Sequence, residues 1–348
     1  MSIGLYPRYD QLGASSRYRF FLYFQRWIQE YGSENIALYP GMSDDYLREL
    51  YASGSVSVGR KLREFGNLFK RALNLPEKLV IEYELVPNLP FSLEKILIGK
   101  RRYILNFDDN VWVKYQGKKG LSDKFDRLCR DAAGIIVANS FLLEKVKKLN
   151  SNVILIPTVV DLEKYDCGTI EKFPRFTAVW IGTPVTYAYL EQALPMLQKV
   201  FSVADRELLV VADSALAEKR PLPGVNVRYE NWSQESEIEY LQRSHIGIMP
   251  LSDDEFSRGK SAFKLLQYQA AGLPLIASPV GENNLVVREG CNGFLAGSVE
   301  EWQKAFEHLF SDRGFYEQCS RNSRQCAYEY SLQKYFPVYH DFVLQTLS

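Results

Sequence analysis

The segment from residue 250 to residue 281 carries a set of polar side chains that could bind an anion. Arg258 is followed by Lys260, Lys264 and Gln267, and the spacing of the last three would place them on one face of a helix. Cations at a helix start oppose the helix dipole. A bound diphosphate would offset that cost, because a helix N-terminus and fixed cations attract an anion together. The alternative is a solvated basic face on an ordinary surface helix.

A helix is predicted over this region, beginning around Gly259 or Lys260 and ending at Gly272 in the left-handed conformation. It follows a predicted strand that ends near Met249. Small residues come after the helix and favour close packing of helix and strand, and Gly281 would let the backbone approach a ligand closely.

A second group of cations lies near the N-terminus. Ser15 or Ser16 is predicted to cap a helix that carries Arg17, Arg19 and Arg26. These are again cations at the start of a helix, so we expect an anion close to them. The alternative is that these arginines pair with acidic neighbours at the surface.

Carboxylates follow two of the predicted strands. Asp108 and Asp109 come directly after the apolar stretch 103–107, where one of them could bind an acceptor hydroxyl or accept its proton. Capping of the next turn is the alternative role for these aspartates. Glu82 and Glu84 end the preceding strand and could likewise act in the site or have a purely structural role. The sequence Asp-Asp-Asn is not a DxD motif, and the five cysteines include no CxxC pair. We therefore expect no dedicated metal site and no cofactor.

Composition limits the classes of function that remain. The chain has 348 residues, a net charge of zero and 46% hydrophobic residues, which is typical of a globular protein of two domains. Residues 1–163 carry a net charge of +5 and residues 164–348 a net charge of −5. The sequence shows no nucleic-acid-binding motif, no apolar run of about 18 residues and no signal peptide at its start. We expect a cytoplasmic protein that does not bind nucleic acid.

Short apolar runs alternate with helical patterns along the whole chain, which predicts an α/β fold with helices on both faces of parallel sheets. The predicted strands of the first half are 3–6, 36–39, 79–83, 103–107, 134–138 and 153–156. Those of the second half are 176–181, 208–212, 225–229, 246–249, 275–277 and 293–296. Two Rossmann-like domains are therefore expected, 1–163 and 164–330, joined by a polar linker at 161–174. Ligands are expected in a cleft between them, beyond the carboxyl ends of the strands.

The last stretch, 331–348, is predicted to form a helix that starts near Pro337 and packs across the domain boundary. Its apolar stripe would be Phe336, Tyr339, Val343 and Leu347.

Residues 59–73 combine four apolar side chains at helical spacing with five basic residues. A basic amphipathic helix can lie on an anionic membrane, and this predicts peripheral contact with the inner face of the cell membrane. A core-facing helix is the alternative.

The stretch 263–281, with 290–295 after it, resembles the donor-site signature of family 4 glycosyltransferases, which are retaining enzymes with the GT-B fold. Residues 13–19, 156–161 and 180–184 are similar to further segments of that family. The resemblance implies an N-terminal acceptor domain and a C-terminal donor domain facing an interdomain cleft. It implies transfer of a sugar from a nucleotide diphosphate sugar to a hydroxyl of a glycan or lipid-linked acceptor.

The sequence departs from the family at two glutamates, whose places resemble Gly259 and Gln267. A Gln amide can share the ribose contact of the second glutamate. Asp254 or Glu255 could stand in for the first, and the alternatives are that the sugar is held otherwise or that catalysis is poor. The basic pair usual at the start of the donor domain is also missing, since Gly182 and Thr183 offer only backbone amides and a hydroxyl.

The predicted site therefore has three parts. The catalytic residues are Arg258, Lys260, Lys264, Asp108 and Asp109. The donor-binding residues are Gly182, Thr183, Asp254, Glu255, Gln267, Gly281, Glu282 and Asn283. The acceptor side comprises Gly13, Ala14, Ser15, Arg17, Arg19 and Glu84.

Two other functions fit the same pattern. A non-catalytic GT-B protein that binds a nucleotide sugar or a glycan would explain Gly259 and Gln267 directly. An epimerase acting on the nucleotide sugar would need acid and base groups beside the sugar, which only the carboxylates provide. A nicotinamide-dependent dehydrogenase is disfavoured, because no GxGxxG follows the first strand.

Overall fold

The computed structural model describes residues 2–166, 168, 170–213 and 215–348. The chain divides into two compact units. The first contains residues up to Val159 together with Gly259–Ser261 and Leu332–Ser348, and the second contains Val160–Arg258 and Ala262–Ser331. The division falls four residues before the one expected from the sequence. The expected linker at 161–174 contains a 3-10 helix at Leu162–Tyr165, and its residues 167 and 169 lie outside the described part of the chain.

The first unit is built on a parallel sheet of six strands in the order β2-β1-β3-β4-β5-β6. The strands are β1 (Ile3–Tyr6), β2 (Ile36–Leu38), β3 (Lys78–Glu82), β4 (Arg102–Phe107), β5 (Gly134–Val137) and β6 (Val153–Leu155). Each corresponds to a stretch predicted from the sequence, with ends shifted by at most one residue.

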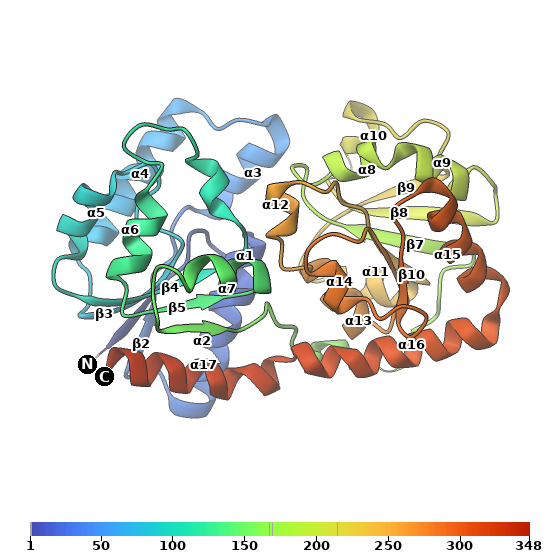
Figure 1. Ribbon diagram of the computed structural model, residues 1–348. Coiled ribbons are helices and arrows are strands. Elements are labelled where there is room, and N and C mark those ends of the chain that lie inside the picture. Colours follow the sequence, from blue (N-terminus) through green and yellow to red (C-terminus); the bar gives the residue numbers. More distant parts are fainter. Residues whose placement is uncertain (1, 167, 169, 214) are drawn as a thin grey trace. The chain divides into compact units, whose positions relative to one another are not determined.

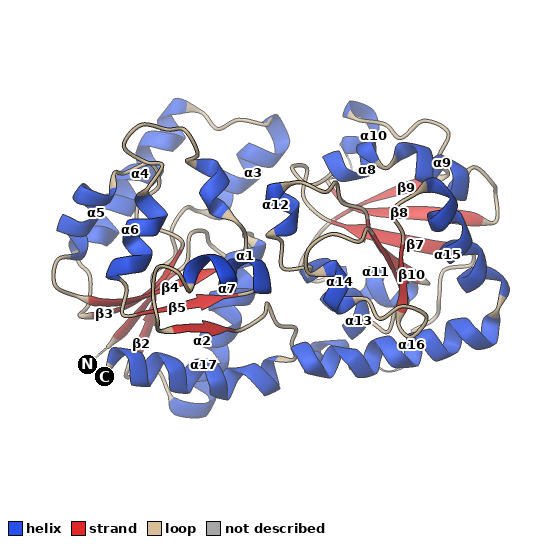
Figure 2. Ribbon diagram, in the orientation of Figure 1, coloured by secondary structure: helices blue, strands red, loops and turns tan. Residues whose placement is uncertain are grey.

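The helices of the first unit cover both faces of this sheet (Figures 1 and 2). They are α1 (Ala14–Ser16), α2 (Leu22–Tyr31), α3 (Asp44–Ser53), α4 (Val58–Leu73), α5 (Phe91–Ile98), α6 (Lys124–Asp131), α7 (Ser140–Val146) and α17 (Leu332–Leu347). A π-helical turn at Arg17–Phe21 joins α1 to α2.

The second unit repeats this plan with the strand order β12-β11-β10-β7-β8-β9, again parallel. Its strands are β7 (Phe176–Ile181), β8 (Arg206–Ala212), β9 (Val227–Asn231), β10 (Ile246–Met249), β11 (Leu275–Ala277) and β12 (Gly293–Leu295). Its helices are α8 (Ala188–Gln192), α9 (Leu194–Phe201), α10 (Leu216–Lys219), α11 (Glu237–Arg243), α12 (Glu255–Arg258), α13 (Phe263–Ala270), α14 (Asn283–Val286), α15 (Val299–Ser311) and α16 (Arg313–Ala327). All six strands predicted for this half are present.

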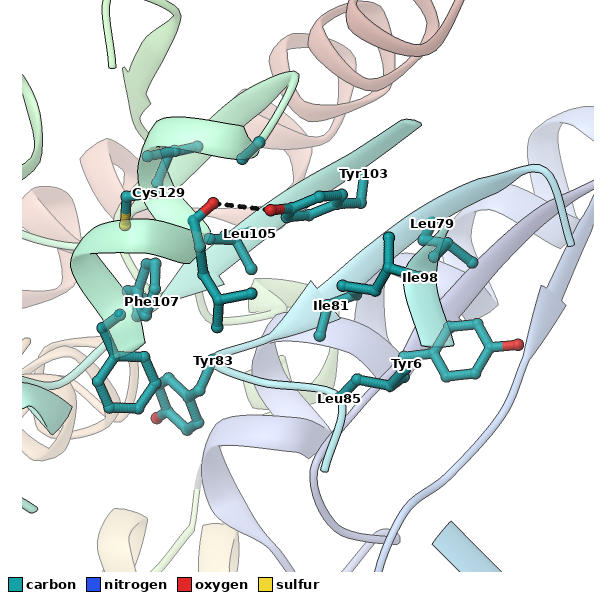
Figure 3. Packing of buried hydrophobic residues seen from close by; sticks show 14 of the residues in the cluster. Tyr6, Leu79, Ile81, Tyr83, Leu85, Ile98, Tyr103, Leu105, Phe107 and Cys129 are labelled. Carbon is teal, nitrogen blue, oxygen red and sulfur yellow. Dashed lines mark hydrogen bonds between the residues drawn. The ribbon is translucent and has the colours of Figure 1, made fainter. Parts of the chain in front are cut away.

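Alternate residues of each strand pack into cores on opposite faces of the sheet, which is why the strands read as continuous apolar runs. In β3, Leu79 and Ile81 join one core and Val80 joins the other. Figure 3 shows the first of these cores, where Tyr103 of β4 donates a 2.8 Å hydrogen bond from its hydroxyl to the Leu128 carbonyl. Helices α4 to α7 line this core, and α2 and α17 line the other.

The last helix begins earlier than predicted. Helix α17 starts at Leu332 and contains Pro337 in its interior, so the expected start near Pro337 is wrong. A proline there forfeits one backbone hydrogen bond and costs about 3 kcal/mol. The buried stripe compensates, because its members pack in the core shared with α2. Besides Leu332, that stripe contains the four residues predicted from the sequence, Phe336, Tyr339, Val343 and Leu347.

Candidate active site

The strand order of the second unit reverses beside β7, because β8 pairs with β7 on one side and β10 on the other. Ligands of open α/β sheets bind beyond the carboxyl ends of the strands at such a reversal. Three segments begin there, 182–187 after β7, 250–254 after β10 and 278–282 after β11. Most of the predicted donor-binding residues lie in these segments.

The segments after β10 and β11 are packed directly against each other. The Leu251 N–H donates to the Ser278 hydroxyl at 3.0 Å, and the Ser278 N–H donates to the Met249 carbonyl at 3.1 Å. Gly281 has a φ of +54°, and a Cβ at this position would lie 2.7 Å from the Arg258 carbonyl oxygen. The sequence predicted that the backbone at Gly281 approaches a ligand closely. In the structure its close neighbour is the Arg258 backbone of the same unit.

The turn after β7 is already hydrogen bonded within the unit. The Gly182 N–H donates to the Val211 carbonyl at 3.1 Å, and the Thr183 N–H donates to the Thr186 hydroxyl at 3.2 Å. The amide donors expected here from the sequence are thus used by the fold itself. The Tyr189 and Ser257 hydroxyls, 2.9 Å apart, connect α8 to α12 and fix this turn beside the segment after β10.

The helix predicted from Gly259 or Lys260 is two helices in the structure. Helix α12 ends at Arg258, and α13 begins only at Phe263, after Ala262 with a left-handed φ of +51°. The prediction that Lys260 shares a helix face with Lys264 and Gln267 is therefore wrong.

The early start of α12 has a local cause. The Asp254 carboxylate accepts a 2.7 Å hydrogen bond from the Ser257 N–H, which caps the short helix one turn before the predicted start. Gly272 ends the second helix with a φ of +73°, as expected. Asp254 thus has a structural role besides its predicted contact with the donor, and Glu255 lies exposed in the first turn of α12.

The three predicted phosphate-binding cations differ in their surroundings. Arg258 is exposed and pairs with Asp253 through contacts of 2.6 Å and 3.0 Å. Lys264 is half-buried on α13, with its Nζ 5.4 Å from the centre of the Trp180 ring. Lys260 is half-buried and belongs to the first unit.

Helix α13 is held firmly at the ends of β7 and β10. The Tyr268 hydroxyl accepts a 3.1 Å hydrogen bond from the Ile181 N–H, and a Cβ on Gly247 would lie 2.3 Å from the Tyr268 ring. Gln267, on the same helix, is buried. No side chain caps α13 at Ala262 in the described chain, so its amino end depends on backbone groups.

The predicted residues after β11 support the loop that contains them. Asn283 is buried and donates a 2.9 Å hydrogen bond to the Ser278 carbonyl. Glu282 is half-buried and stands at the start of α14. Asn283 therefore shapes the loop around Gly281, and Glu282 is the more accessible of the two side chains.

The strand order of the first unit reverses beside β1, which lies between β2 and β3. At this reversal the carboxyl end of β1 is followed by Arg8, and β3 ends in Glu82 and is followed by Tyr83 and Glu84. The Glu82 side chain is buried and accepts a 2.7 Å hydrogen bond from the Arg8 N–H. Glu82 thus joins the ends of the two strands.

The N-terminal helix is not capped by a serine. Gly13 occupies the N-cap position of α1, and Ser16 lies inside the first turn. The Ser16 hydroxyl donates to Glu82 at 2.6 Å and accepts from the Tyr9 N–H at 2.9 Å. The predicted cap is therefore wrong, because Ser16 is used to bind the end of β3. Ala14 is exposed and Ser15 half-buried on the same turn.

The arginines of this helix have partners within the first unit. Arg19 is buried, and its guanidinium donates to the Asn106 side chain at 2.7 and 2.9 Å and to the Ile156 carbonyl at 2.6 Å. Arg17 donates to the Gln11 carbonyl at 3.1 Å, and Arg26 pairs with Glu30. These contacts account for Arg19 and Arg26 without an anion. Arg17, which keeps its predicted role on the acceptor side, is buried as well.

Burial, and next the nearby Asp108 carboxylate, raise the pKa of Glu82 to about 7. Asp108 itself is buried and accepts a hydrogen bond from the Tyr83 hydroxyl. Tyr83 has a φ of +61°, which is a strained conformation for a bulky residue. Strained residues and shifted carboxyl groups often mark functional sites. Asp109, the next residue, is half-buried.

Glu84 lies at the centre of a buried ionic network. It contacts Lys124 at 2.6 Å, Lys114 at 2.9 Å and Arg8 at 3.3 Å, and the Tyr115 hydroxyl donates to it at 2.9 Å. Burial alone would raise the pKa of Glu84, but the three cations hold it below its usual value. This carboxylate therefore stays ionised and organises cations around it.

Three groups of this network were not predicted from the sequence. Arg8 comes two residues after the end of the first strand, a position at which a charged residue can be recognised as a site candidate. Lys114 and Lys124 lie in polar stretches without a distinguishing pattern. Burial, followed by the nearby Arg8, lowers the pKa of Lys114 to about 8. Only the folded structure brings them to Glu84.

Comparisons with known proteins agree with this architecture. Residues 176–312 match the family model described as glycosyl transferases group 1. Glucosyltransferase 3 of Streptococcus gordonii is 24% identical over 255 residues, which cover 71% of this chain and 66% of that protein, slightly under two thirds of its length.

Among solved structures, HepE of Anabaena in complex with UDP aligns with a TM-score of 0.67 and 12% identity over 99% of this chain and 100% of that chain. Sucrose-phosphate synthase of Thermosynechococcus elongatus aligns with a TM-score of 0.65 and 12% identity over 99% and 98% of the two chains. At such low identities these matches show the fold. The chain thus has the GT-B fold, and its residues 176–312 are a match to the group 1 glycosyl transferases, as the resemblance to a glycosyltransferase predicted.

Proposed function

We propose that this protein transfers a sugar from a nucleotide diphosphate sugar to a hydroxyl group of a glycan or lipid-linked acceptor, with retention at the anomeric carbon. The observation that carries the proposal is the group 1 glycosyl transferase match over residues 176–312. It covers the strand reversal beside β7, with the three loops that converge there. No resident metal or cofactor is part of the proposal.

A UDP-sugar is the first donor to test. HepE has been solved with UDP, with UDP and glucose and with UDP-glucose, and the curated relative is named a glucosyltransferase. These names support a uridine nucleotide and glucose as a starting pair for this chain.

The demanding step is the departure of the nucleoside diphosphate as the sugar acquires positive charge. Lys264, at the amino end of α13, would stabilise the charge that grows on the phosphate oxygens. Arg258 can join it by exchanging its exposed partner Asp253 for phosphate, since exposed ion pairs contribute little stability. Lys260 would add a third cation. The resemblance to retaining enzymes of this fold implies that the leaving phosphate would assist the incoming hydroxyl.

The nucleoside and sugar would be held by polar groups of the same loops. Gln267 would share the ribose contact through its amide, and Glu255 and Glu282 are the accessible carboxylates that could bind sugar hydroxyls. Thr183 offers its hydroxyl after β7. This arrangement replaces the two family glutamates whose places resemble Gly259 and Gln267.

The acceptor would be recognised near the strand reversal of the first unit, beyond the carboxyl end of β4. Asp109 is half-buried there and Asp108 lies beside it, so either could bind the acceptor hydroxyl or receive its proton. Arg17 is the remaining candidate for an anionic group of the acceptor. Glu82 and Glu84 shape this region through their buried contacts.

A non-catalytic nucleotide-sugar-binding protein is the second candidate, favoured by Gly259 and Gln267 in place of the family glutamates. A nucleotide-sugar epimerase is the third, and Glu82, whose pKa is raised to about 7, is its acid or base candidate.

One experiment separates the three. The full chain is incubated with UDP-, GDP-, dTDP- and ADP-sugars, and its thermal stability and the fate of the sugar are followed together. A donor at 100 times its Kd should add about 2.7 kcal/mol of stability. Sugar transfer to an added glycan or lipid-linked acceptor supports the enzyme. Donor binding without transfer supports the binding protein, and conversion of the sugar without an acceptor supports the epimerase. Failure of every nucleotide sugar to bind would overturn all three.

A further inference from the structure

The outward side of α4 and α5 exposes an unusual number of large apolar side chains. They are Val58, Leu62, Phe69 and Leu73 on α4 and Leu93 and Ile96 on α5. These are six of the fourteen large apolar side chains exposed among the described residues, yet the two helices contain only sixteen and eight residues. Such a concentration marks an interaction surface, which we call the α4–α5 surface.

The spacing on α4 forms one continuous stripe. Its four exposed apolar residues follow one another at intervals of four, seven and four positions, which keeps them within one narrow sector of a helix. An adjacent side of α4 buries Leu68 and Ala72 in the core of the first unit. Helix α4 therefore has two apolar sides, and the core accounts for only one of them.

Helix α5 extends this stripe. The two helices are in contact and lie next to each other in Figure 1. Phe65 of α4 and Leu97 of α5 pack against the same core cluster beneath them. The outward side chains Leu93 and Ile96 are 49% and 74% exposed, in line with the 70% exposure of Leu62. Exposed apolar side chains therefore occur on both of these neighbouring helices, and not only on the single segment expected from the sequence.

The exposed charged side chains of α4 and α5 themselves are all basic. Lys61, Arg63 and Lys70 of α4 are exposed, and no carboxylate among the described residues forms an ion pair with them. The only carboxylates of the two helices, Glu64 and Glu94, are buried. Glu64 accepts a hydrogen bond from the Ser43 hydroxyl, and Glu94 pairs with Lys124 at 2.7 Å. The surface thus presents apolar groups and cations together, without an exposed carboxylate of either helix.

We propose that the α4–α5 surface docks this protein on the anionic surface of a lipid bilayer. None of the helices in the described residues is long and apolar enough to cross a membrane. An anionic bilayer surface fits the α4–α5 surface, because the apolar stripe can settle among the headgroups while the cations face acidic lipid. A lipid-linked acceptor would be presented at such an interface, but the docking surface stands without that function.

A second copy of this chain fits the surface less well. A symmetric dimer would bring the same patch of two chains together. Lys61, Arg63 and Lys70 would then face their own copies, with no carboxylate from α4 or α5 to pair with them. Like charges placed opposite each other across an interface are unfavourable. An anionic lipid surface supplies the missing negative charge.

The test is flotation of the full chain with vesicles of phosphatidylcholine alone and with vesicles that also contain phosphatidylglycerol. One variant, Leu62→Ser with Phe69→Ser, removes apolar contact, and another, Lys61→Gln, Arg63→Gln and Lys70→Gln, removes charge. The matched controls change exposed residues elsewhere. They are Val338→Ser with Leu344→Ser, and Lys119→Gln with Lys148→Gln and Lys304→Gln.

We expect the wild-type chain and both controls to float with the acidic vesicles and to be released by salt. Each basic side chain is expected to contribute about fivefold to binding, so the triple charge variant should bind on the order of 100-fold more weakly. The apolar variant should also lose binding, and both variants should keep the nucleotide-sugar turnover of the wild type.

Three results would overturn the proposal. They are no binding to acidic vesicles at low salt, equal binding by the α4–α5 variants and the wild type, and a dimer that Leu62→Ser with Phe69→Ser dissociates. The last result would assign the surface to a second copy of the chain. Turnover of nucleotide sugar is measured separately, so failure of membrane docking is distinguished from failure of the proposed activity.

Discussion

The Ser16 hydroxyl donates a 2.6 Å hydrogen bond to the buried carboxyl group of Glu82. The same carboxyl oxygen accepts the Arg8 N–H at 2.7 Å, so one side chain of β3 fixes both ends of the segment between β1 and α1. The other oxygen, Oε1, is buried and has no hydrogen-bond partner among the described residues. Glu82 therefore holds the predicted acceptor side in place, in an environment that disfavours its charge.

The stability of the protein should depend on pH through Glu82, whose pKa rises from its ordinary value of 4.5 to about 7 in the fold. Between these values the folded chain keeps a proton that the unfolded chain releases, so stability falls as pH rises from about 4.5 to about 7 and is level above. Glu82→Gln should remove this contribution, on the order of 3 kcal/mol. Urea unfolding of wild type and variant from pH 4.5 to 8 measures it.

The control for this prediction is Glu77→Gln, which changes an exposed glutamate just before β3. It should follow the wild-type curve at every pH. Parallel curves for wild type and Glu82→Gln would show that Glu82 titrates normally.

Removing the Ser16 hydroxyl should destabilise the first unit. Ser16→Ala leaves the Glu82 carboxyl without one hydrogen bond and the Tyr9 N–H without its acceptor, at a cost of about 1–3 kcal/mol. Ser15→Ala, on the neighbouring residue, should change stability by less than about 0.5 kcal/mol. Thermal unfolding compares the two, and equal losses would contradict the role assigned to Ser16.

Breaking the ionic network should cost more. Lys124 is fully buried between Glu84 and Glu94, at 2.6 and 2.7 Å, so Lys124→Met leaves two carboxylates without their main counter-charge. We expect a loss of about 3–5 kcal/mol in the free energy of unfolding. Lys119→Met, at an exposed position, serves as the control. A loss below about 1 kcal/mol in Lys124→Met would show that the network is dispensable.

Gly281→Ala should weaken donor binding. The added Cβ would lie 2.7 Å from the Arg258 carbonyl, in a backbone conformation that alanine rarely adopts. The strain should cost about 1–2 kcal/mol and displace Arg258 from the phosphate site. Gly297→Ala adds a methyl group with only ordinary contacts at 3.5 Å and should bind UDP as the wild type does. Titration with UDP compares the two variants.

All twelve strands could be predicted, because strands buried on both faces are short apolar runs that stand out from their polar surroundings. The fold class follows from their alternation with helices. The start of α17 was missed because packing of its stripe outweighs the cost of Pro337, and this balance is visible only in the folded core.

The candidate site was harder to predict, because its details depend on contacts between distant segments. Spacing alone placed Lys260 and Lys264 on one helix, but the left-handed Ala262 separates them. Arg19 matches an anion-binding pattern, yet its guanidinium donates its hydrogen bond to Asn106, which lies 87 residues away in the sequence. Lys124 contacts Glu84, which lies 40 residues away in the sequence, and no local sequence pattern around Lys124 predicts this contact.

The most direct test of donor binding at α13 is the rate at which UDP is released from UDP-glucose. The rate is measured for the wild type, Lys264→Ala and Lys304→Ala, with saturating donor and with the acceptor present. Lys304 is an exposed lysine on α15, so its variant should match the wild type. Lys264→Ala should release UDP on the order of 100-fold more slowly while retaining its fold, because one charge-stabilising group is lost from the transition state. Equal rates in all three proteins would contradict the assignment of the donor site to α13.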